Sequence, residues 1–524
     1  MKLSLLDIII VGVYLVGIIG IGLNVSRGRT KTTRQFFTAD RSIPSWAVAF
    51  TLMATIVGSG TFIGHPGTAY QLGMILFLPH LMLPVVLIFV SIWIVPFYRR
   101  VVQMSAYEYI ARRFGVVSRV YSSFGFLADR IFDLAVTLVT TGIALYVFTG
   151  WHPGQVILGV GLFTLIYTMI GGITAVAWTN VAQGIVLSLG AVLILARVLF
   201  APEIGNPMAI IRTSWEAGRY SLGSWDFSWH SLFDRGTPTV WIFFGAYFIQ
   251  WSRRYITDQH IVQSYLIART DRDASRGAFF GALACLPVFF IFMFIGGSLY
   301  GFFALQTGDP GPVRPDEVMP YFLSHYIPSG VLGLILAAIL AATMSSVSAD
   351  LNSIATVLTT DYFSRMFSGV SDRARLLFGR FMVLAGGLAA TGIAMLLIPT
   401  EGSTPVNLRA IIIATIISAG SLGLFGLGFL TKRATRTGAG VGIAACLVFS
   451  AWALLSQADD QGRRLVDFGF NWEMNPILIG VFGHFVLFGV GWLASVLFGG
   501  YRPSDIGDLT IWSHKLHRGK ESNS

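Results

Sequence analysis

Residues 54–67 read Ala54-Thr55-Ile56-Val57-Gly58-Ser59-Gly60-Thr61-Phe62-Ile63-Gly64-His65-Pro66-Gly67, an apolar run that carries four glycines and a proline. A glycine inside a helix costs roughly 1 kcal/mol relative to alanine and a proline about 3 kcal/mol, so the run is expected to unwind. In a bilayer, the freed carbonyl groups need partners in protein, water or an ion. Such a break is typical of helices that present carbonyl oxygens to bound ions. The alternative is close helix packing through small residues.

The composition of the whole chain places this run in a membrane. Of the 524 residues, 54% are hydrophobic and 12% are charged, and this charged share is about half that of an ordinary soluble protein. A bilayer removes the need for a polar surface. The formal charge of +10 does not indicate nucleic-acid binding, because Lys and Arg stand in short clusters between apolar segments. Cys285 and Cys446 both lie in apolar runs, which indicates neither a disulfide nor a metal framework.

Thirteen apolar segments are candidate membrane spans. They lie near 4–24, 44–66, 74–98, 117–149, 154–170, 180–201, 238–252, 274–304, 328–361, 376–398, 408–430, 437–455 and 475–499. The first has only Lys2 before it and no cleavage site after it, so we expect a retained helix rather than a signal peptide. The tail 500–524 is too short to fold alone. We therefore expect one all-helical, polytopic domain over 1–524.

Basic residues indicate how the chain is oriented in the membrane. Clusters follow the first, third, seventh, ninth, eleventh and thirteenth spans, and examples are Arg99 with Arg100 and Lys432 with Arg433. The alternate loops, such as 202–237 and 305–327, hold fewer basic residues, which are mixed with acids. The positive-inside rule then places the N-terminus outside and the tail 500–524 in the cytoplasm, with the chain in the inner membrane.

A second polar segment lies in the ninth span, which includes Ala341-Ala342-Thr343-Met344-Ser345-Ser346-Val347-Ser348-Ala349-Asp350. Ala342, Ser345 and Ser346 are three and four residues apart, so they share one face of a helix. The two hydroxyls offer neutral oxygens, which at about 2.4 Å suit a hard cation that must also be released. The alternative is that each serine bonds back to a carbonyl of its own helix.

Four short motifs follow one another along the chain. They are Ser105-Ala106-Tyr107-Glu108-Tyr109, Gly171-Gly172-Ile173 with Trp178-Thr179, Thr257-Asp258-Gln259-His260-Ile261-Val262-Gln263, and Ser345-Ser346-Val347-Ser348 with Leu351-Asn352-Ser353. With the thirteen spans, they resemble the sodium:solute symporter family, which includes sodium-coupled glucose, proline and sialic acid transporters. The likeness covers roughly residues 5–455. It implies a LeuT-type inverted repeat, with an extra helix at 4–24, five-helix repeats at 44–201 and 238–430, and two final helices at 437–499.

The resemblance also implies where sodium binds. Position by position, the family's main sodium site corresponds to the carbonyls of Ala54, Val57 and Ala342 and to the hydroxyls of Ser345 and Ser346. These residues belong to the same two segments that the sequence singles out by itself.

A second sodium site is not expected. Family members that have one carry an aspartate just after the Trp-Thr pair and extra serines in the later helix, whereas this chain has Asn180 and Ala349 at those positions. A neutral amide lacks the Coulomb attraction that would hold a second cation. Asp350 is close in sequence, but nothing in the sequence shows that it compensates. We expect one sodium ion per cycle.

Charged residues in the fourth span, Asp129, Arg130 and Asp133, are candidates for the solute site, because charges inside a membrane are costly. Sialic acid transporters of the family have an arginine at the position of Asp133, where it meets the solute carboxylate. The reversed charge argues against binding of the same anion. The alternative is a structural pair between Arg130 and Asp133, which are three residues apart.

Three other residues are candidates for contact with solute. Gly58 and Thr61 lie at the break in the second span, and His80 stands where relatives place a polar substrate-binding side chain. A packing role for His80 is the alternative. Trp251 and Arg254 are weaker candidates, as an inner gate.

The sequence therefore predicts a sodium-coupled symporter of a small organic solute, with sugars and polyols favoured over amino acids and carboxylates. The alternative is a transporter-like solute sensor or a sodium-gated channel. The expected partners are the solute, sodium and the bilayer, with no nucleic acid and no obligatory protein partner. We expect no enzyme, because the chain has neither a His-Glu-x-x-His helix nor a nucleophile elbow.

Overall fold

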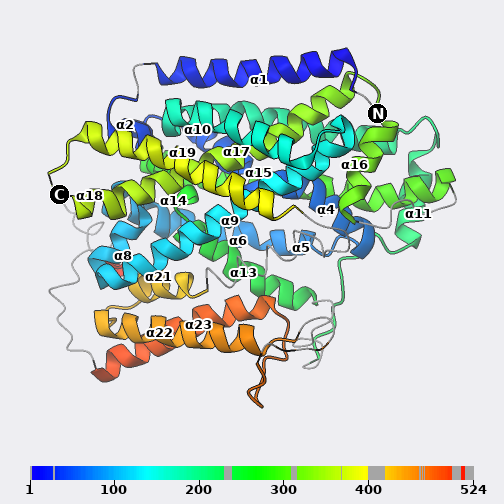
Figure 1. Cartoon of the computed structure of the whole chain (residues 1–524). Helices are drawn as coiled ribbons and strands as arrows, with labels where there is room; N and C mark the ends of the chain where they lie inside the picture. Colours follow the sequence, from blue (N-terminus) through cyan, green and yellow to red (C-terminus); the bar gives the residue numbers. More distant parts are fainter. Residues whose placement is uncertain are drawn as a thin grey trace, which may run out of the picture.

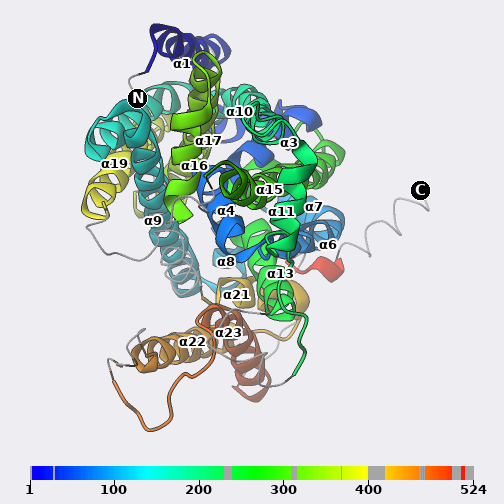
Figure 2. The ribbon, with the colours of Figure 1, turned by 90° about the vertical axis from the view of Figure 1, so that its right-hand side faces the viewer.

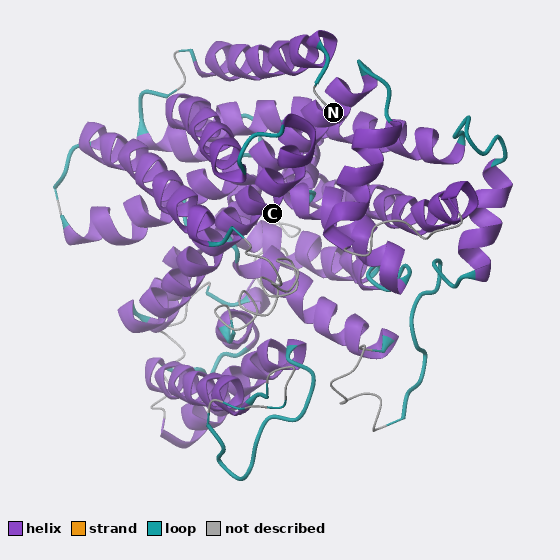
Figure 3. Cartoon of the chain, turned by 45° about the vertical axis from the view of Figure 1, so that its right-hand side comes forward, coloured by secondary structure: helices purple, strands orange, loops and turns teal. Residues whose placement is uncertain are grey.

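The computed structural model describes residues 3–27, 30–228, 239–307, 315–367, 369–398, 419–458, 462, 464, 466–498 and 509–513. Within these ranges every regular element is helical, as Figure 3 shows, and the predicted all-helical class is confirmed. Residues 408–418 of the predicted eleventh span lie outside the described residues. So does the predicted tail 500–524, apart from 509–513.

The helices fall into long membrane-length elements and short connecting ones. The long ones are α1 (Leu5–Ser26), α9 (Val116–Thr149), α10 (Pro153–Leu199), α13 (Val240–Thr257), α15 (Asp271–Thr307), α17 (Val331–Val357), α19 (Asp372–Leu396), α22 (Arg436–Ser456) and α23 (Ile477–Phe498). The others include α2 (Thr33–Thr38), α3 (Ser45–Ile56), α4 (Ser59–Leu72), α5 (Phe77–His80), α6 (Met82–Phe89), α7 (Val95–Val101), α8 (Ala106–Phe114), α11 (Pro207–Glu216), α14 (Gln259–Leu266), α16 (Pro315–Tyr326), α18 (Ser364–Met366) and α21 (Ser421–Leu430).

The number of spans is only partly settled by these helices. Among the described residues, nine helical stretches are long and apolar enough to cross a membrane, and the bent pair of α3 and α4 makes a tenth. The nine are the long helices above without α13, together with the continuous stretch Phe77–Val101, which contains α5, α6 and α7. Two predicted spans, 154–170 and 180–201, lie on the single helix α10. The predicted span 238–252 lies on α13, and α21 carries the described end of the span at 408–430. The count of thirteen stays a prediction.

Helix α10 changes direction where the sequence has a glycine pair. At about 1.5 Å per residue its 47 residues would extend roughly 70 Å, more than twice the hydrocarbon thickness of a bilayer. Gly172 interrupts it with φ 54° and ψ −156°, a conformation that is open essentially to glycine alone. A Cβ atom there would lie 2.6 Å from the carbonyl oxygen of Phe36 on α2. The break separates the two predicted spans.

The core of the molecule is built around α17, which packs against α10, α1, α9, α19 and α3. Figures 1 and 2 show α1 at one edge and the pair α22–α23 at the opposite edge. Large apolar side chains on α1, including Leu5, Ile9 and Val16, are more than half exposed. In a bilayer this surface faces lipid, so its exposure costs nothing.

The predicted break in the second span is present, but it is shorter than expected. Helix α3 ends at Ile56, α4 begins at Ser59, and the two are bent by 56°. The remainder of the run does not unwind, because α4 continues through Gly64 and Pro66. There α15 approaches α4 closely at a glycine of its own: a Cβ atom on Gly296 of α15 would lie 2.2 Å from the carbonyl oxygen of Pro66. The expectation of an unwound 54–67 was therefore wrong except at Val57 and Gly58, the two residues between α3 and α4.

Candidate functional site

Four of the five predicted sodium ligands come together between the end of α3 and the middle of α17, namely those of Ala54, Ala342, Ser345 and Ser346. No hydrogen bond in the described structure joins the carbonyl of Val57 to them. The hydroxyl of Ser345 donates to the carbonyl oxygen of Ala54 at 2.7 Å and approaches that of Ala342 at 3.1 Å. The hydroxyl of Ser346 approaches the carbonyls of Thr55 at 3.1 Å and Ala342 at 3.3 Å. Each serine thus makes the predicted contact back to its own helix and a second contact across to α3, and its role as a sodium ligand stays a prediction.

The break in the second span supplies the carbonyl groups on the α3 side. Because the helix stops at Ile56, the last turn of α3 is not continued, and the carbonyls of Ala54 and Thr55 accept from serines of α17. Val57 lies at the break itself, with φ −87° and ψ 84°. Cation ligation requires such oxygens freed from helix hydrogen bonds.

Gly58 also lies against the face of α17 that carries Ala342, Ser345 and Ser346, which we call the serine face. A Cβ atom on Gly58 would stand 3.0 Å from the hydroxyl oxygen of Ser346 and 4.0 Å from the carbonyl of Ala342. The predicted solute residue Gly58 is thus a neighbour of the predicted sodium oxygens. It leaves space that any other side chain would fill.

Asn180 stands where family members with a second sodium site have an aspartate. Its side chain contacts α3 at Thr55. Its amide nitrogen donates to the hydroxyl of Thr55 at 3.2 Å, and its buried Oδ1 has no hydrogen-bond partner in the described structure. Thr55 therefore links Asn180 to Ser346 through its own side chain and carbonyl.

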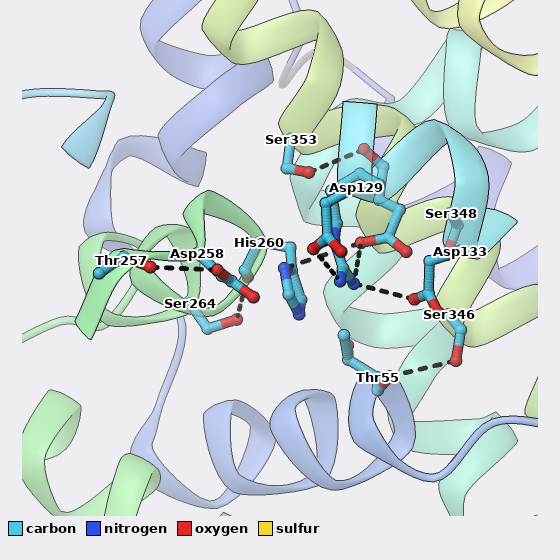
Figure 4. Close-up of polar contacts among 12 residues, drawn as sticks. Thr55, Asp129, Asp133, Thr257, Asp258, His260, Ser264, Ser346, Ser348 and Ser353 are labelled. Carbon is cyan, nitrogen blue, oxygen red and sulfur yellow. Dashed lines mark hydrogen bonds and ion pairs between the residues drawn. The ribbon is translucent and has the colours of Figure 1, made fainter. Parts of the chain in front are cut away.

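A buried network of charges surrounds the fourth span (Figure 4). Arg130 contacts Asp129 at 2.6 Å and Asp133 at 2.9 Å, and it lies 3.8 Å from Asp350 of α17. The predicted pair of Arg130 and Asp133 is confirmed. The side chain of Asp133 is 41% exposed, whereas that of Asp129 is fully buried.

The network extends to residues that the sequence did not single out. Arg253 of α13 lies 3.4 Å from Asp129 and 3.5 Å from Asp258. His260 lies 3.7 Å from Asp350. Asp258 and His260 belong to the third motif, so their motif membership was the available signal. A buried ion pair is favourable only when the remaining polar atoms are satisfied as well. Here they are not all satisfied, because Asp129 Oδ1, Asp258 Oδ2 and Asp350 Oδ1 are buried without a hydrogen-bond partner among the described residues.

The motifs also bind to each other. The side chain of Gln259 accepts from the backbone nitrogen of Ala106 at 2.8 Å and donates to the carbonyl of Met104 at 2.6 Å. Gln263 donates to Asn352 at 2.8 Å. The first, third and fourth motifs are thus joined through α14, whereas the second forms the corner of α10.

The remaining solute candidates lie on α4 and α5. Thr61 and His80 are both buried. The ring of His80 stacks on Phe289 of α15 with centroids 3.8 Å apart, and its Nε2 lies 3.3 Å from Nε2 of His65. Packing fixes the ring of His80, yet its buried Nδ1 has no partner among the described residues. Trp251 of α13 is 5.7 Å from the same ring.

Two hollows lie away from these candidates, and both border Arg253. One is lined by residues such as Tyr107, Phe126 and Asp258, and the other by residues such as Gln250 and His484. The predicted solute residues line neither hollow.

Comparison with known proteins identifies close relatives over most of the chain. The family model of the sodium:solute symporter family matches residues 36–445. The chain is 29% identical to a sodium/sialic acid symporter of Aliivibrio fischeri, over 96% of this chain and 95% of that protein. It is 30% identical to a sodium/sialic acid symporter of Proteus mirabilis, over 83% and 86%. It is 29% identical to a sodium/glucose cotransporter of Vibrio parahaemolyticus, over 86% and 85%.

Solved structures agree with the sequence relatives. A Na+-coupled sialic acid symporter in a substrate-bound, outward-open state matches with a TM-score of 0.83 and 27% identity, covering 94% of this chain and 98% of that one. The nucleobase-cation-symport-1 transporter Mhp1 in a closed conformation matches with a TM-score of 0.53 and 16% identity, over 90% and 98%. These matches confirm the LeuT-type fold. The relatives are sodium-coupled transporters and not enzymes. From its motifs, its fold and the family match over most of its length, the chain belongs to the sodium:solute symporter family.

Proposed function

We propose that this sodium-coupled symporter carries one sodium ion per cycle together with a neutral or zwitterionic solute, with sugars and polyols favoured over amino acids and carboxylates. The observation that carries the proposal is the contact between the broken second span and the serine face of α17. We assign the sodium ligands as the carbonyls of Ala54, Val57 and Ala342 and the hydroxyls of Ser345 and Ser346.

The geometry of these oxygens accounts for ion coupling. The carbonyl of Ala54 and the hydroxyl of Ser345 belong to α3 and α17, which are separate elements of the predicted first and second repeats. A cation shared between them favours the arrangement in which α3 and α17 are close. Release of the ion removes that preference, so ion binding and the approach of the two helices are linked. Alternating access uses this linkage.

The solute preference rests on Asp133. A carboxylate with an exposed side attracts hydrogen-bond donors and repels a solute carboxylate. The known relatives include proteins named for sialic acid and for glucose, so their names alone do not select a class. We propose that the solute binds at Gly58, Thr61, His80 and Asp133. Sodium binds separately, at the serine face of α17.

The orientation in the inner membrane is proposed from the basic loops, and loop contacts support it. Arg99, predicted to be cytoplasmic, pairs with Asp271 at 2.5 Å and donates to the carbonyl of Tyr265 at 2.7 Å, and all three lie in regions assigned to the same side. Near the predicted outer side, the carboxylate of Asp7 accepts from the backbone nitrogen of Gly330 at 2.7 Å. Segments assigned to one side thus contact each other, which supports the grouping of the loops, and the choice of an outside N-terminus and a cytoplasmic C-terminus rests on the basic clusters.

Uptake by purified protein in proteoliposomes tests the proposal against the two alternative functions. With an inward sodium gradient, we expect saturable accumulation of the solute above its outside concentration, abolished when sodium is replaced by choline. A channel would give flux without uphill accumulation. A sensor would bind the solute without moving it.

A further inference from the structure

His80 of the predicted solute site and its neighbour His65 form a chain of hydrogen bonds with a fixed direction. His65 Nδ1 lies 3.4 Å from the carbonyl oxygen of Gly60, and its Nε2 lies 3.3 Å from Nε2 of His80. A carbonyl oxygen only accepts, so His65 Nδ1 carries a proton. The neighbours of His65 include the rings of Phe289 and His80, and an imidazolium among aromatic rings would lose its hydration without a counter-ion. His65 is therefore neutral, with a bare Nε2.

The protonation of His80 follows from that of His65. A bare Nε2 on His65 accepts, so the facing Nε2 of His80 must donate and carries the proton of its ring. The other nitrogen, His80 Nδ1, is then an acceptor. It is buried, and it has no hydrogen-bond partner among the described residues. Stacking on Phe289 at 3.8 Å holds the ring in place.

A second buried polar atom without a partner among the described residues lies on Trp251, whose ring is beside that of His80. Trp251 is buried, its ring is 5.7 Å from that of His80, and its Nε1 has no partner in the part of the chain described. An indole nitrogen only donates. The aromatic wall near His80 therefore presents one bare acceptor and one bare donor. A hydroxyl group matches either atom, because it can donate to His80 Nδ1 or accept from Trp251 Nε1, whereas a carboxylate cannot donate to His80.

We propose that His65 sets the tautomer of His80 and so makes this end of the solute site an acceptor that selects a hydroxyl-bearing, carboxylate-free solute. The inference rests on the proposed function, because it takes His80 as a solute contact. His65 is a positioning residue: it acts through His80 without touching the solute. A solute that lacks the matching group binds more weakly, because it leaves a buried polar group of the site without a hydrogen bond.

The tautomers are measured directly by solid-state NMR on the full chain, labelled with ¹⁵N-histidine and reconstituted in lipid. Protonated and bare ring nitrogens have well-separated shifts, and the signals are assigned by their loss in His65→Asn and His80→Asn. We expect a proton on Nε2 and none on Nδ1 for His80, and the reverse for His65. A proton on Nδ1 of wild-type His80 overturns the inference, whether or not any variant folds.

Two substitutions of His65 separate its hydrogen bond from its packing. His65→Gln keeps an acceptor for His80, whereas His65→Phe keeps only an aromatic ring beside Phe289. We expect the wild-type tautomer of His80 in His65→Gln and a mixture of tautomers in His65→Phe. The same single tautomer of His80 in both variants would show that His65 does not set it.

The solute class is tested with defined probes in saturating sodium: D-glucose, D-mannitol and myo-inositol against pyruvate and propionate. We expect binding among the first three, weakened about tenfold in His65→Phe and less in His65→Gln, as for loss of one hydrogen bond. Preferential binding of pyruvate or propionate overturns the inference. Sodium binding without solute is measured in the same samples, and its absence would contradict the symport site while leaving the tautomer result to stand by itself.

Discussion

The hydroxyl of Ser345 lies 2.7 Å from the carbonyl oxygen of Ala54, a residue 291 positions earlier in the chain. This contact joins the only bent pair of membrane helices in the described residues to the most buried long helix, α17. The hydroxyl proton occupies the space between the two oxygens. If the hydroxyl turns, both oxygens present lone pairs to the same point, which is what ligation of a hard cation requires.

Removal of either hydroxyl should weaken sodium binding. For Ser345→Ala and Ser346→Ala we expect a loss of about 1.5–3 kcal/mol, roughly ten- to hundredfold in sodium affinity, because each removes one ion contact. Sodium dependence of uptake and of thermal stability measures the effect. Ser353→Ala is the matched control, since its hydroxyl bonds only back to Asp350 of the same helix, at 2.7 Å. Unchanged sodium affinity in both test variants would refute the site.

Substitution of Asp133 should affect solute binding, whereas substitution of Asp129 should affect stability. In Asp133→Asn, Arg130 keeps Asp129 at 2.6 Å, so the protein should fold and bind sodium, and its half-saturation constant for solute should rise. In Asp129→Asn, Arg130 and Arg253 both lose a buried partner, and a loss of about 3–5 kcal/mol in stability is expected. Thermal unfolding and uptake are the measurements. Normal transport by a folded Asp133→Asn would remove Asp133 from the solute site.

Gly172 should be intolerant of any side chain. Gly172→Ala forces a Cβ atom to within 2.6 Å of the Phe36 carbonyl at φ 54°, so we expect a loss of about 2–5 kcal/mol. Gly159→Ala on the same helix is the control, because no atom lies within 4 Å of its added carbon, and its effect should stay within about 1 kcal/mol. Melting temperatures in detergent compare the two. Equal stability of both variants would mean that the corner of α10 can relax.

The proposed orientation predicts the result of reporter fusions. Fusions after Gly28, Gly205 and Ser524 should report inside, outside and inside, because the basic clusters follow odd-numbered spans. Activity of a periplasmic reporter at Ser524 would require an even number of spans.

Sodium stoichiometry should be one. A reversal potential in proteoliposomes fixes the ratio of sodium to solute at zero net flux, and we expect a ratio of one, with a Hill coefficient near 1 for the sodium dependence. If the wild-type ratio is two instead, Asn180→Asp should change sodium affinity rather than add a further coupled ion. A ratio of two in the wild type would assign a second ion to Asp350 or another buried oxygen.

The parts of the fold that were predictable are those that depend on local composition. Apolar length identified the helices, and Val57 with Gly58 marks the break because glycine weakens a helix locally. The local rule was wrong at Pro66, because α4 continues through this residue and its carbonyl packs against Gly296, 230 residues away in the chain.

In the candidate site, too, local sequence patterns predicted some residues, whereas others depend on contacts between distant helices. Ser345 and Ser346 were found because helical spacing puts them on one face. The pairing of Arg253 with Asp129 was not, because α13 and α9 are far apart in sequence and ion pairs between helices leave no periodic signal. His65 was missed for a related reason: its importance lies in which nitrogen faces His80, a property of three-dimensional geometry.

The contact of Arg99 with Asp271 also has a consequence for biogenesis. The two residues are 172 positions apart, and at 5–20 residues per second a ribosome needs roughly 10–35 s to make the intervening chain. During that time the first spans are already in the bilayer, while Arg99 at the end of α7 still lacks its carboxylate and the carbonyls of the later loop. The early helices must therefore wait in the membrane for the later half of the chain before they reach their final packing, so assembly of this transporter is limited by translation.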